Sequence, residues 1–182
     1  IKAKEKLSDG TAVPCQGQLY YRGINIRDIV SGFMKDGRYG FEETVYLLLF
    51  SELPTRAQLD RFTQELSEYR SLPTSFVRDM ILKAPGRDMM NVLSRSVLAL
   101  YAYDENPDDI SIPNVLRQCI MLISVFPMLS VYSYQAYNHY ICGDSFYIHN
   151  PSPDISTAGN ILRMLRPDMK YSKFEAAILD LA

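Results

Sequence analysis

Two histidines are the side chains of this 182-residue sequence best suited to proton transfer near neutral pH. His139 lies in a stretch that predicts a buried helix, where we expect a hydrogen-bonded structural role for it. His149 lies in the Pro-rich segment YIHNPSP, which predicts a loop that could face a site. No partner motif accompanies His149, so the sequence favours a structural role for both residues.

Three cysteines could bind a metal ion or form a disulfide, but their spacing fits neither. Cys15, Cys119 and Cys142 form no CxxC pair, their number is odd, and the chain is not a small disulfide scaffold. We expect three buried free thiols in a reducing compartment and no metal site.

The charged residues form no pattern of a binding site either. The acidic run DENPDD, residues 104–109, lacks the Gly and the bidentate Glu of a calcium loop, so we interpret it as a solvated turn. Arg27, Arg56 and Arg70 fall at predicted helix surfaces, where salt bridging or solubility is the expected role. The formal charge of −2 gives no reason to expect nucleic acid or an anionic membrane as a partner.

Catalytic motifs with strong spacing rules are missing from the sequence. It contains no HExxH, GxSxG, GxxxxGK[ST] or GxGxxG. With 47% hydrophobic and 22% charged residues it has a globular composition. No signal peptide precedes the charged first residues, although a sequence that begins at Ile1 without Met is expected to be cut at that end.

The elements that must position these side chains are predicted to be mostly helices, because apolar residues recur at helical spacing along most of the sequence. This periodicity predicts an all-α fold of about eight or nine helices, with at most a short β hairpin or strand near the N-terminus. The expected helices cover residues 26–34, 41–54, 55–69, 75–83, 89–103, 112–140, 156–165 and 172–182. Residues 112–140 are predicted as two helices or one kinked helix, with the discontinuity at Pro127. Extended segments are expected at 19–21 and, more weakly, at 146–148.

Two capping boxes mark helix beginnings. One runs from Thr55 to Gln58, and the other runs from Ser172 to Glu175. Behind the second, an apolar stripe of Phe174, Ile178 and Leu181 continues to the end of the sequence without any C-terminal capping device. We therefore expect that the sequence stops inside a helix.

One stretch, residues 119–142, resembles a membrane span in composition. Its strongly apolar part covers only Ile120–Val131, about a dozen residues with Pro127 inside, whereas a bilayer needs about 20. We expect a buried core helix there. With no internal repeat and no long linker, residues 1–182 are expected to form part of one domain.

Several stretches carry a family likeness in their order and spacing. LYYRGINIRDIV (19–30) has a Tyr-Arg-Gly turn entering a helix, and FEETVYLLLFSELPT (41–55) combines Phe-Glu-Glu, Leu-Leu and Glu-Leu-Pro-Thr. LRQCIMLISVFPMLSVYSYQAY (116–137), ISTAGNILRML (155–165) and FEAAILDLA (174–182) follow. Together these stretches resemble the citrate synthase family over nearly the whole chain.

The sequence departs from the family pattern at two places. It has Asp-Met-Met at 88–90 where many members have His-Pro-Met, and Ile161 where Phe is commoner. The chain is similar to a divergent, bacterial-type member, and any role of that His is not transferred to Asp88.

The resemblance implies that residues 1–182 are the N-terminal portion of the large helical domain of a citrate synthase. In the family, the helix that here reaches Ala182 continues into a His-Ala-Asp/Glu-His segment that binds oxaloacetate, and the catalytic residues come later. We therefore assign no catalytic, cofactor-binding or metal-binding residue within the chain, and expect the 182 residues alone to be inactive.

The expected activity of the complete protein also follows from the resemblance. It is the condensation of acetyl-CoA with oxaloacetate to citrate, in a cytoplasmic homodimer or higher oligomer that needs no cofactor beyond the co-substrate. Two alternatives stay open: a 2-methylcitrate synthase that uses propionyl-CoA, and a non-catalytic helical interaction module. These 182 residues do not distinguish the first alternative from a citrate synthase, because the residues of the acyl-CoA pocket are expected further along the chain.

Overall fold

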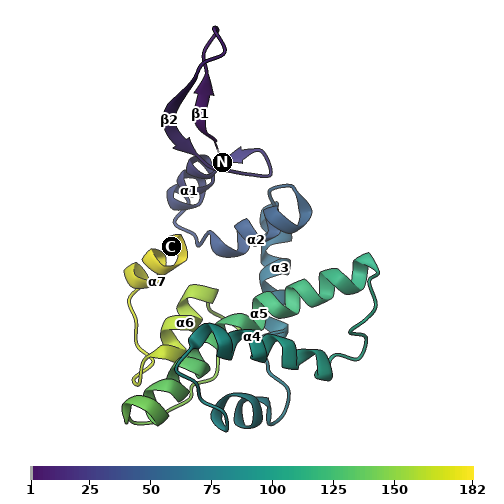
Figure 1. Cartoon of the computed structure of the whole chain (residues 1–182), viewed down its shortest axis with the longest axis vertical. Helices are drawn as coiled ribbons and strands as arrows, with labels where there is room; N and C mark the ends of the chain where they lie inside the picture. The colour runs from purple at the N-terminus through teal and green to yellow at the C-terminus, as the bar shows by residue number, and fades with distance from the viewer. Residues whose placement is uncertain (1) are drawn as a thin grey trace. The chain divides into compact units, whose positions relative to one another are not determined.

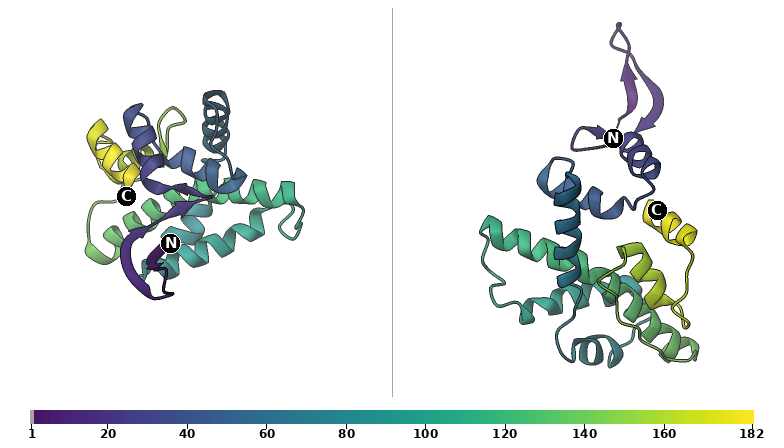
Figure 2. Two further views of the ribbon diagram at one scale, coloured as in Figure 1. Left: turned by 90° about the horizontal axis from the view of Figure 1, so that it is seen from above. Right: turned by 180° about the vertical axis from the view of Figure 1, so that it is seen from behind.

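Helices make up most of the chain, which we describe over residues 2–182 in a computed structural model (Figures 1 and 2). The chain divides into two compact units. The first contains the residues up to Phe62 together with Ala177–Ala182, and the second contains Thr63–Ala176. The predicted all-α class with a short N-terminal hairpin is confirmed. The assignment of residues 1–182 to one large domain stays a prediction.

An antiparallel hairpin begins the first unit. Strands β1 (Lys2–Lys6) and β2 (Ala12–Gln18) pair with Lys4 opposite Pro14 and Lys6 opposite Ala12. Figure 1 shows this hairpin in purple, extending away from α1. The sequence allowed for such a hairpin but gave no alternation that would locate its strands.

A second, tighter hairpin forms at the predicted Tyr-Arg-Gly turn. Strands β3 (Tyr20–Tyr21) and β4 (Ile24–Asn25) are joined by Arg22 and Gly23, whose φ angles are 50° and 87°. Positive φ angles at both residues of a two-residue hairpin loop are typical of a type I′ turn, whose twist matches that of the paired strands. The strained Arg22 is anchored by its side chain, because Nε and Nη2 both donate to the carbonyl of Leu48, at 3.1 and 2.6 Å.

Helices α1 (Ile26–Lys35) and α2 (Phe41–Phe50) build the small core of the first unit. Ile29 and Phe33 from α1 pack with Leu47 from α2. The side chain of Asn25 caps α1 by accepting from the amide of Arg27 at 3.0 Å. The predicted end of the second helix at Pro54 is wrong: α2 ends at Phe50, because Ser51 takes a left-handed conformation with φ 66°.

Helix α3 (Arg56–Glu68) begins at the first capping box, which is confirmed. The amide of Thr55 donates to Gln58 Oε1 at 2.8 Å, and the amide of Gln58 donates to Thr55 Oγ1 at 3.4 Å. Phe62 and Leu66, four residues apart on one side of α3, are buried. The residues of α3 up to Phe62 belong to the first unit and the others to the second.

The second unit consists of helices around one apolar core. Its elements are the π-helical turn η1 (Val77–Leu82), α4 (Met89–Leu100), the 3₁₀ turn η2 (Tyr101–Tyr103), α5 (Ile112–Tyr137), the π-helical turn η3 (Asn138–Cys142), α6 (Thr157–Leu165) and α7 (Lys173–Leu181), whose last residues belong to the first unit. The core residues from these elements include Phe76, Ile81, Leu100, Val125, Leu129, Tyr132 and Met164. Helices α4 and α6 both pack against α5.

Helix α5 runs through Pro127 as one α-helix. Of the two predicted alternatives, the pair of separate helices is therefore wrong and the single helix is the one observed. It is followed directly by η3, which extends the helical segment to Cys142. By length and composition, Ile112–Cys142 is the one segment of the described residues that could cross a membrane, and 39% of its most apolar window is buried. Because α5 contributes Val125, Leu129 and Tyr132 to the core, its packing supports the predicted core helix.

Two further expectations need correction. Residues 146–148 form no strand, because the loop they belong to is held by side-chain bonds to the end of α6. The helix expected over 75–83 is reduced to η1, because Ser75 has a φ of 66° and lies outside it. The predicted helices 26–34, 89–103 and 156–165 are confirmed to within a few residues.

Candidate functional site

Both histidines are hydrogen-bonded to backbone carbonyls. His139 Nδ1 lies 2.8 Å from the carbonyl oxygen of Asp144, and His149 Nε2 lies 3.1 Å from that of Pro167. Since a carbonyl only accepts, each of these ring nitrogens carries a proton. The structural role predicted for the two histidines is supported, and neither is paired with a nucleophile.

The loop around His149 fixes the C-terminal end of α6. Tyr147 Oη and Gln135 Nε2 both donate to the carbonyl of Leu165, at 2.6 and 3.1 Å, and so satisfy a helix-terminal acceptor. Tyr132 Oη donates to the carbonyl of His149 at 3.1 Å. Burial raises the pKa of Tyr132 to about 12, so this phenol remains a proton donor at neutral pH.

The three cysteines are free thiols, but the prediction that they are buried is wrong. Cys142 is exposed, and Cys15 and Cys119 are half-buried. Cys15 lies on the open hairpin, and Cys142 ends η3 just before the left-handed Gly143. Among the described residues, no group of three or more His, Cys, Asp or Glu side chains could hold a metal ion.

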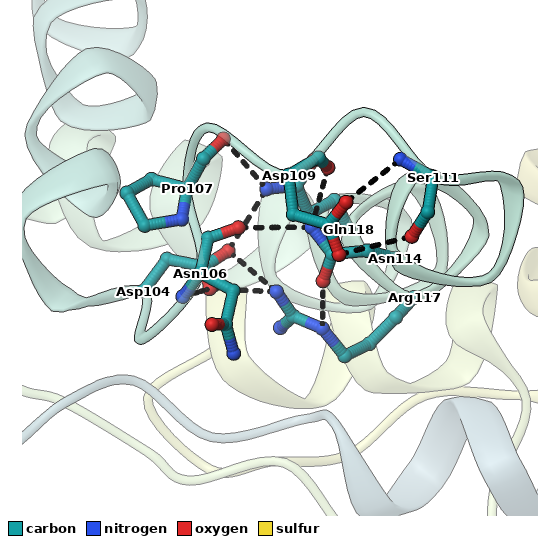
Figure 3. A network of polar contacts seen from close by, with 8 residues as sticks. All are labelled: Asp104, Asn106, Pro107, Asp109, Ser111, Asn114, Arg117 and Gln118. Atoms are coloured by element: carbon teal, nitrogen blue, oxygen red, sulfur yellow. Dashed lines mark hydrogen bonds and ion pairs between the residues drawn. The ribbon is translucent and has the colours of Figure 1, made fainter.

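The acidic turn is an organised network, shown in Figure 3. Arg117 Nη2 donates to both carboxylate oxygens of Asp104, at 2.6 and 2.8 Å, and Gln118 Nε2 donates to one of them at 3.1 Å. The amide of Asn106 also donates to Asp104, and this bond is the largest cause that lowers the pKa of that carboxyl. The solvated turn predicted for residues 104–109 agrees with the exposed Glu105, Asn106, Asp108 and Asp109, but it is wrong for the Asp104 side chain, which is 5% exposed.

Asn114 completes this network at the start of α5. Its Nδ2 donates to the carbonyls of Asn106 and Asp109, at 2.9 and 2.8 Å, while Arg117 Nε donates to its Oδ1 at 2.9 Å (Figure 3). The Asp109 carboxylate accepts from the amide and hydroxyl of Ser111. These carboxylates already bind protein donors, so the network acts as a brace and does not resemble a calcium loop. Two patterns in the sequence could have indicated this network: Asp-x-Asn at 104–106 and Asp-x-Ser at 109–111, which favour turns closed by an Asp side chain.

The three arginines singled out in the sequence have different roles. Arg56 pairs with Asp60 at 3.0 Å, as expected for a helix surface. Arg70 lies beyond the end of α3, and it donates to the carbonyl of Ile155 at 2.9 Å and to Thr157 Oγ1 at 3.1 Å. Its role is to link two segments of the second unit, which the surface prediction missed. Arg27 is exposed.

A hollow of about 310 Å³ lies beside Arg27 in the first unit. It is lined by Gln16, Gly17, Gln18, Leu19, Asn25, Ile26 and Arg27. No histidine, cysteine or carboxylate is among these residues, so the hollow offers amides and one guanidinium but no proton-transfer group. The sequence assigned no site residue here or elsewhere in the chain, and that assignment stays a prediction.

Comparison with known proteins assigns the family. Residues 4–182 match the family model described as citrate synthase, C-terminal domain. The chain belongs to the citrate synthase family. The resemblance inferred from the sequence is therefore confirmed.

The relatives of this citrate synthase family chain are longer proteins. The citrate synthase of Haloferax volcanii is 35% identical over 172 residues, which cover 91% of this chain and 41% of that protein. The 2-methylcitrate synthase 1 of Corynebacterium glutamicum is 34% identical over 106 residues, 56% of this chain and 26% of that protein. The chain thus spans about two fifths of the length of its more fully matched curated relative.

The fold agrees with a solved structure. The crystal structure of citrate synthase from Pyrobaculum aerophilum has a TM-score of 0.73 and 24% identity, and the match covers 91% of this chain and 40% of that one. The fold described above is therefore that of part of a citrate synthase.

Proposed function

We propose that residues 1–182 are the N-terminal portion of the large helical domain of a citrate synthase, which condenses acetyl-CoA with oxaloacetate to give citrate and CoA. The observation that carries this proposal is the match to the Haloferax volcanii citrate synthase, 35% identical over 91% of this chain. The match covers 41% of that relative, which leaves room for catalytic groups outside the 182 residues.

The contacts of the described residues support a framework role. His139 and His149 are bound to backbone carbonyls, and the carboxylates of Asp104 and Glu175 are paired with Arg117 and Arg166. General acid–base catalysis needs a group with a free position for the substrate proton. The two carboxylates offer no such position, whereas each histidine keeps a second ring nitrogen. The family resemblance is therefore what leads us to assign the proton-transfer groups to residues outside this sequence.

The proposed chemistry has three steps. A carboxylate removes a proton from the acetyl-CoA methyl group while a histidine stabilises the charge that develops on the thioester oxygen. The resulting enol attacks the ketone of oxaloacetate, and water then hydrolyses the thioester of citryl-CoA to release CoA. Acetyl-CoA enters as the co-substrate, CoA leaves as a product, and the scheme uses no metal ion.

The test is a thiol-release assay on the complete protein that carries these residues. With acetyl-CoA and oxaloacetate, we expect CoA thiol to appear at a rate that depends on oxaloacetate. Omitting oxaloacetate controls for simple thioester hydrolysis. A complete protein without turnover would count against the proposal and would favour the non-catalytic helical module.

A second candidate function is 2-methylcitrate synthesis from propionyl-CoA. It is favoured by the Corynebacterium glutamicum relative, which is 34% identical over 106 residues. One extra methylene is worth roughly 10–200-fold in discrimination by an apolar pocket, so kcat/KM for the two thioesters separates the candidates. A higher value for propionyl-CoA would replace the first proposal by the second.

We also propose that the complete protein is cytoplasmic and forms a homodimer or higher oligomer. Large apolar side chains on α4 support self-association, since Met90 is 71% and Leu98 is 75% exposed. Size-exclusion chromatography with light scattering measures the mass directly, and a monomer at working concentrations would contradict the proposal.

A further inference from the structure

The N-terminus of α2 cannot carry its own side-chain cap. Gly40 occupies the N-cap position, where Ser, Thr, Asp or Asn normally supply an oxygen to the first free amides. A Cβ added at Gly40 would lie 2.2 Å from Cε1 of Phe33, whose ring belongs to the core of the first unit. Since this packing excludes every side chain at position 40, an acceptor has to come from elsewhere in the chain.

Asp180 of α7 supplies that acceptor. Its Oδ2 accepts from the amide of Gly40 at 2.6 Å, and its Oδ1 lies 3.4 Å from the amide of Phe41. Both partners belong to the first unit, although 140 residues separate Asp180 from Gly40. A carboxylate at a helix N-terminus also interacts favourably with the helix dipole.

The end of α7 has few other attachments. Ile178 is 52% exposed and Leu181 is 44% exposed. Ala176 is the one buried residue of α7, and it precedes the part of the helix that belongs to the first unit. Leu179 is half-buried in this turn, and the two bonds of Asp180 add a directed polar contact that ties it to the start of α2.

We propose that Asp180 is a positioning residue, which caps α2 from a distance and fixes the end of α7, and with it the path of the polypeptide beyond this helix. The consequence for catalysis rests on the proposed function, in which the segments after α7 bind oxaloacetate and carry the reacting groups.

The surroundings of Asp180 determine how well its ionised carboxylate is stabilised. Burial raises the pKa of Asp180 most, and the negative charge of Glu42 raises it further, whereas the amides of Gly40 and Phe41 lower it. Arg38, which precedes α2 in the sequence, is bonded to Asp36 and Glu43. The two amides and the helix dipole are therefore the contacts that favour the ionised carboxylate.

The local test uses this chain and measures amide hydrogen exchange at pH 7 in wild type and Asp180→Ala. We expect exchange at Gly40, at Phe41 and in the last turn of α7 to become roughly five- to tenfold faster, as for a lost N-cap. Amides in α5 are expected to keep their rates. Asp60→Asn, at an exposed carboxylate of α3, is the matched control and should change neither segment.

Two outcomes of this test differ from the expected one, and the first of them overturns the proposal. Faster exchange at Gly40 and Phe41 alone, with α7 unchanged, would mean that Asp180 caps α2 without anchoring α7. Equal acceleration in α5 would mean general destabilisation. In that case the variant Asp180→Asn, which keeps the side-chain shape and one acceptor oxygen, decides. Faster amide exchange confined to residues 40–41 and α7 supports the proposal. Equally faster exchange throughout the chain overturns it.

The catalytic test uses the complete protein with Asp180→Asn and Asp60→Asn. We expect kcat/KM for oxaloacetate to fall about tenfold in Asp180→Asn, because small displacements of reacting groups lower rates strongly, while the melting temperature stays close to that of wild type. If the complete wild-type protein is active and Asp180→Asn has the same kcat/KM for oxaloacetate, the positioning role is overturned. An inactive parent would instead contradict the proposed function and leave the exchange test to decide on Asp180.

Discussion

At the scale of single residues, Glu175 shows how one carboxylate joins two local structures. Its Oε2 accepts from the amide of Ser172 at 2.8 Å and completes the capping box of α7, while Oε1 pairs with Arg166 at 2.6 Å. The Arg166 guanidinium first, and then the Ser172 donors, lower the pKa of Glu175 to about 2. The ionised carboxylate is therefore the form that the fold favours.

This lowered pKa predicts a pH dependence. A carboxyl whose folded pKa lies below its unfolded value stabilises the fold above the unfolded value, near 4.5, and loses that contribution as the pH falls through about 2. We expect the NMR titration of Glu175 to have its midpoint near 2, and Arg166→Ala to move it upward. Lys173→Ala removes a positive charge from the same helix without removing the pair. A midpoint that Arg166→Ala leaves in place would contradict this cause.

The polar network of Asp104, Arg117 and Gln118 at the start of α5 gives a second prediction for single residues. Asp104→Asn keeps the shape but removes the charge that Arg117 and Gln118 bind, and the side chain is 5% exposed. We expect a loss of about 1–3 kcal/mol in the free energy of unfolding, measured with urea. Glu105→Gln, at an exposed neighbour, is the control. Because the pKa of Asp104 is lowered, the difference should shrink as the pH falls below its unfolded value.

At the scale of elements, two glycines in the first unit provide a matched pair. Gly40→Ala would place a methyl group 2.2 Å from the Phe33 ring, so we expect it to cost about 1–3 kcal/mol of stability. Gly32→Ala lies inside α1 with nothing within 4 Å, and is expected to stabilise by up to about 1 kcal/mol. Thermal unfolding of both variants checks the signs, and equal effects would contradict the packing argument.

The elements that the sequence predicted well have local signals. Both capping boxes form with the expected partners, and α1 and α6 begin at the side-chain caps Asn25 and Ser156. The end of α2 was misplaced because Pro54 is a familiar stop signal, whereas a left-handed Ser51 has no strong sequence mark. Strand β1 was missed because its Lys and Glu residues show no apolar alternation.

Contacts between distant residues had no sequence signal. The bond between Asp180 and Gly40 depends on the Phe33 ring filling the place of a side chain at position 40. The link from Arg70 to Thr157 likewise depends on how the segment after α3 approaches the start of α6. Such partners follow from packing, which a single sequence with no local motif does not specify.

At the scale of the whole molecule, the comparisons assign the chain to a family of longer enzymes. In the proposed function the reacting groups lie outside these residues, and the two described histidines each donate one ring N–H to a backbone carbonyl. We predict that the 182-residue chain alone forms no citrate from acetyl-CoA and oxaloacetate. The thiol assay that detects turnover by the complete protein is the measurement. Activity of the shorter chain would move the chemistry into the described residues.

The N-terminal hairpin also has a consequence for how copies of the protein behave toward one another. Strands β1 and β2 form a two-stranded sheet, so among the described residues both outer edges keep hydrogen-bonding groups that another strand could use. The exposed charged residues Lys4, Glu5 and Lys6 lie along β1, and such charges disfavour pairing with a foreign strand. Chemical acetylation of Lys4 and Lys6 would remove two of these charges, so we expect it to make pairing between the hairpins of two copies easier.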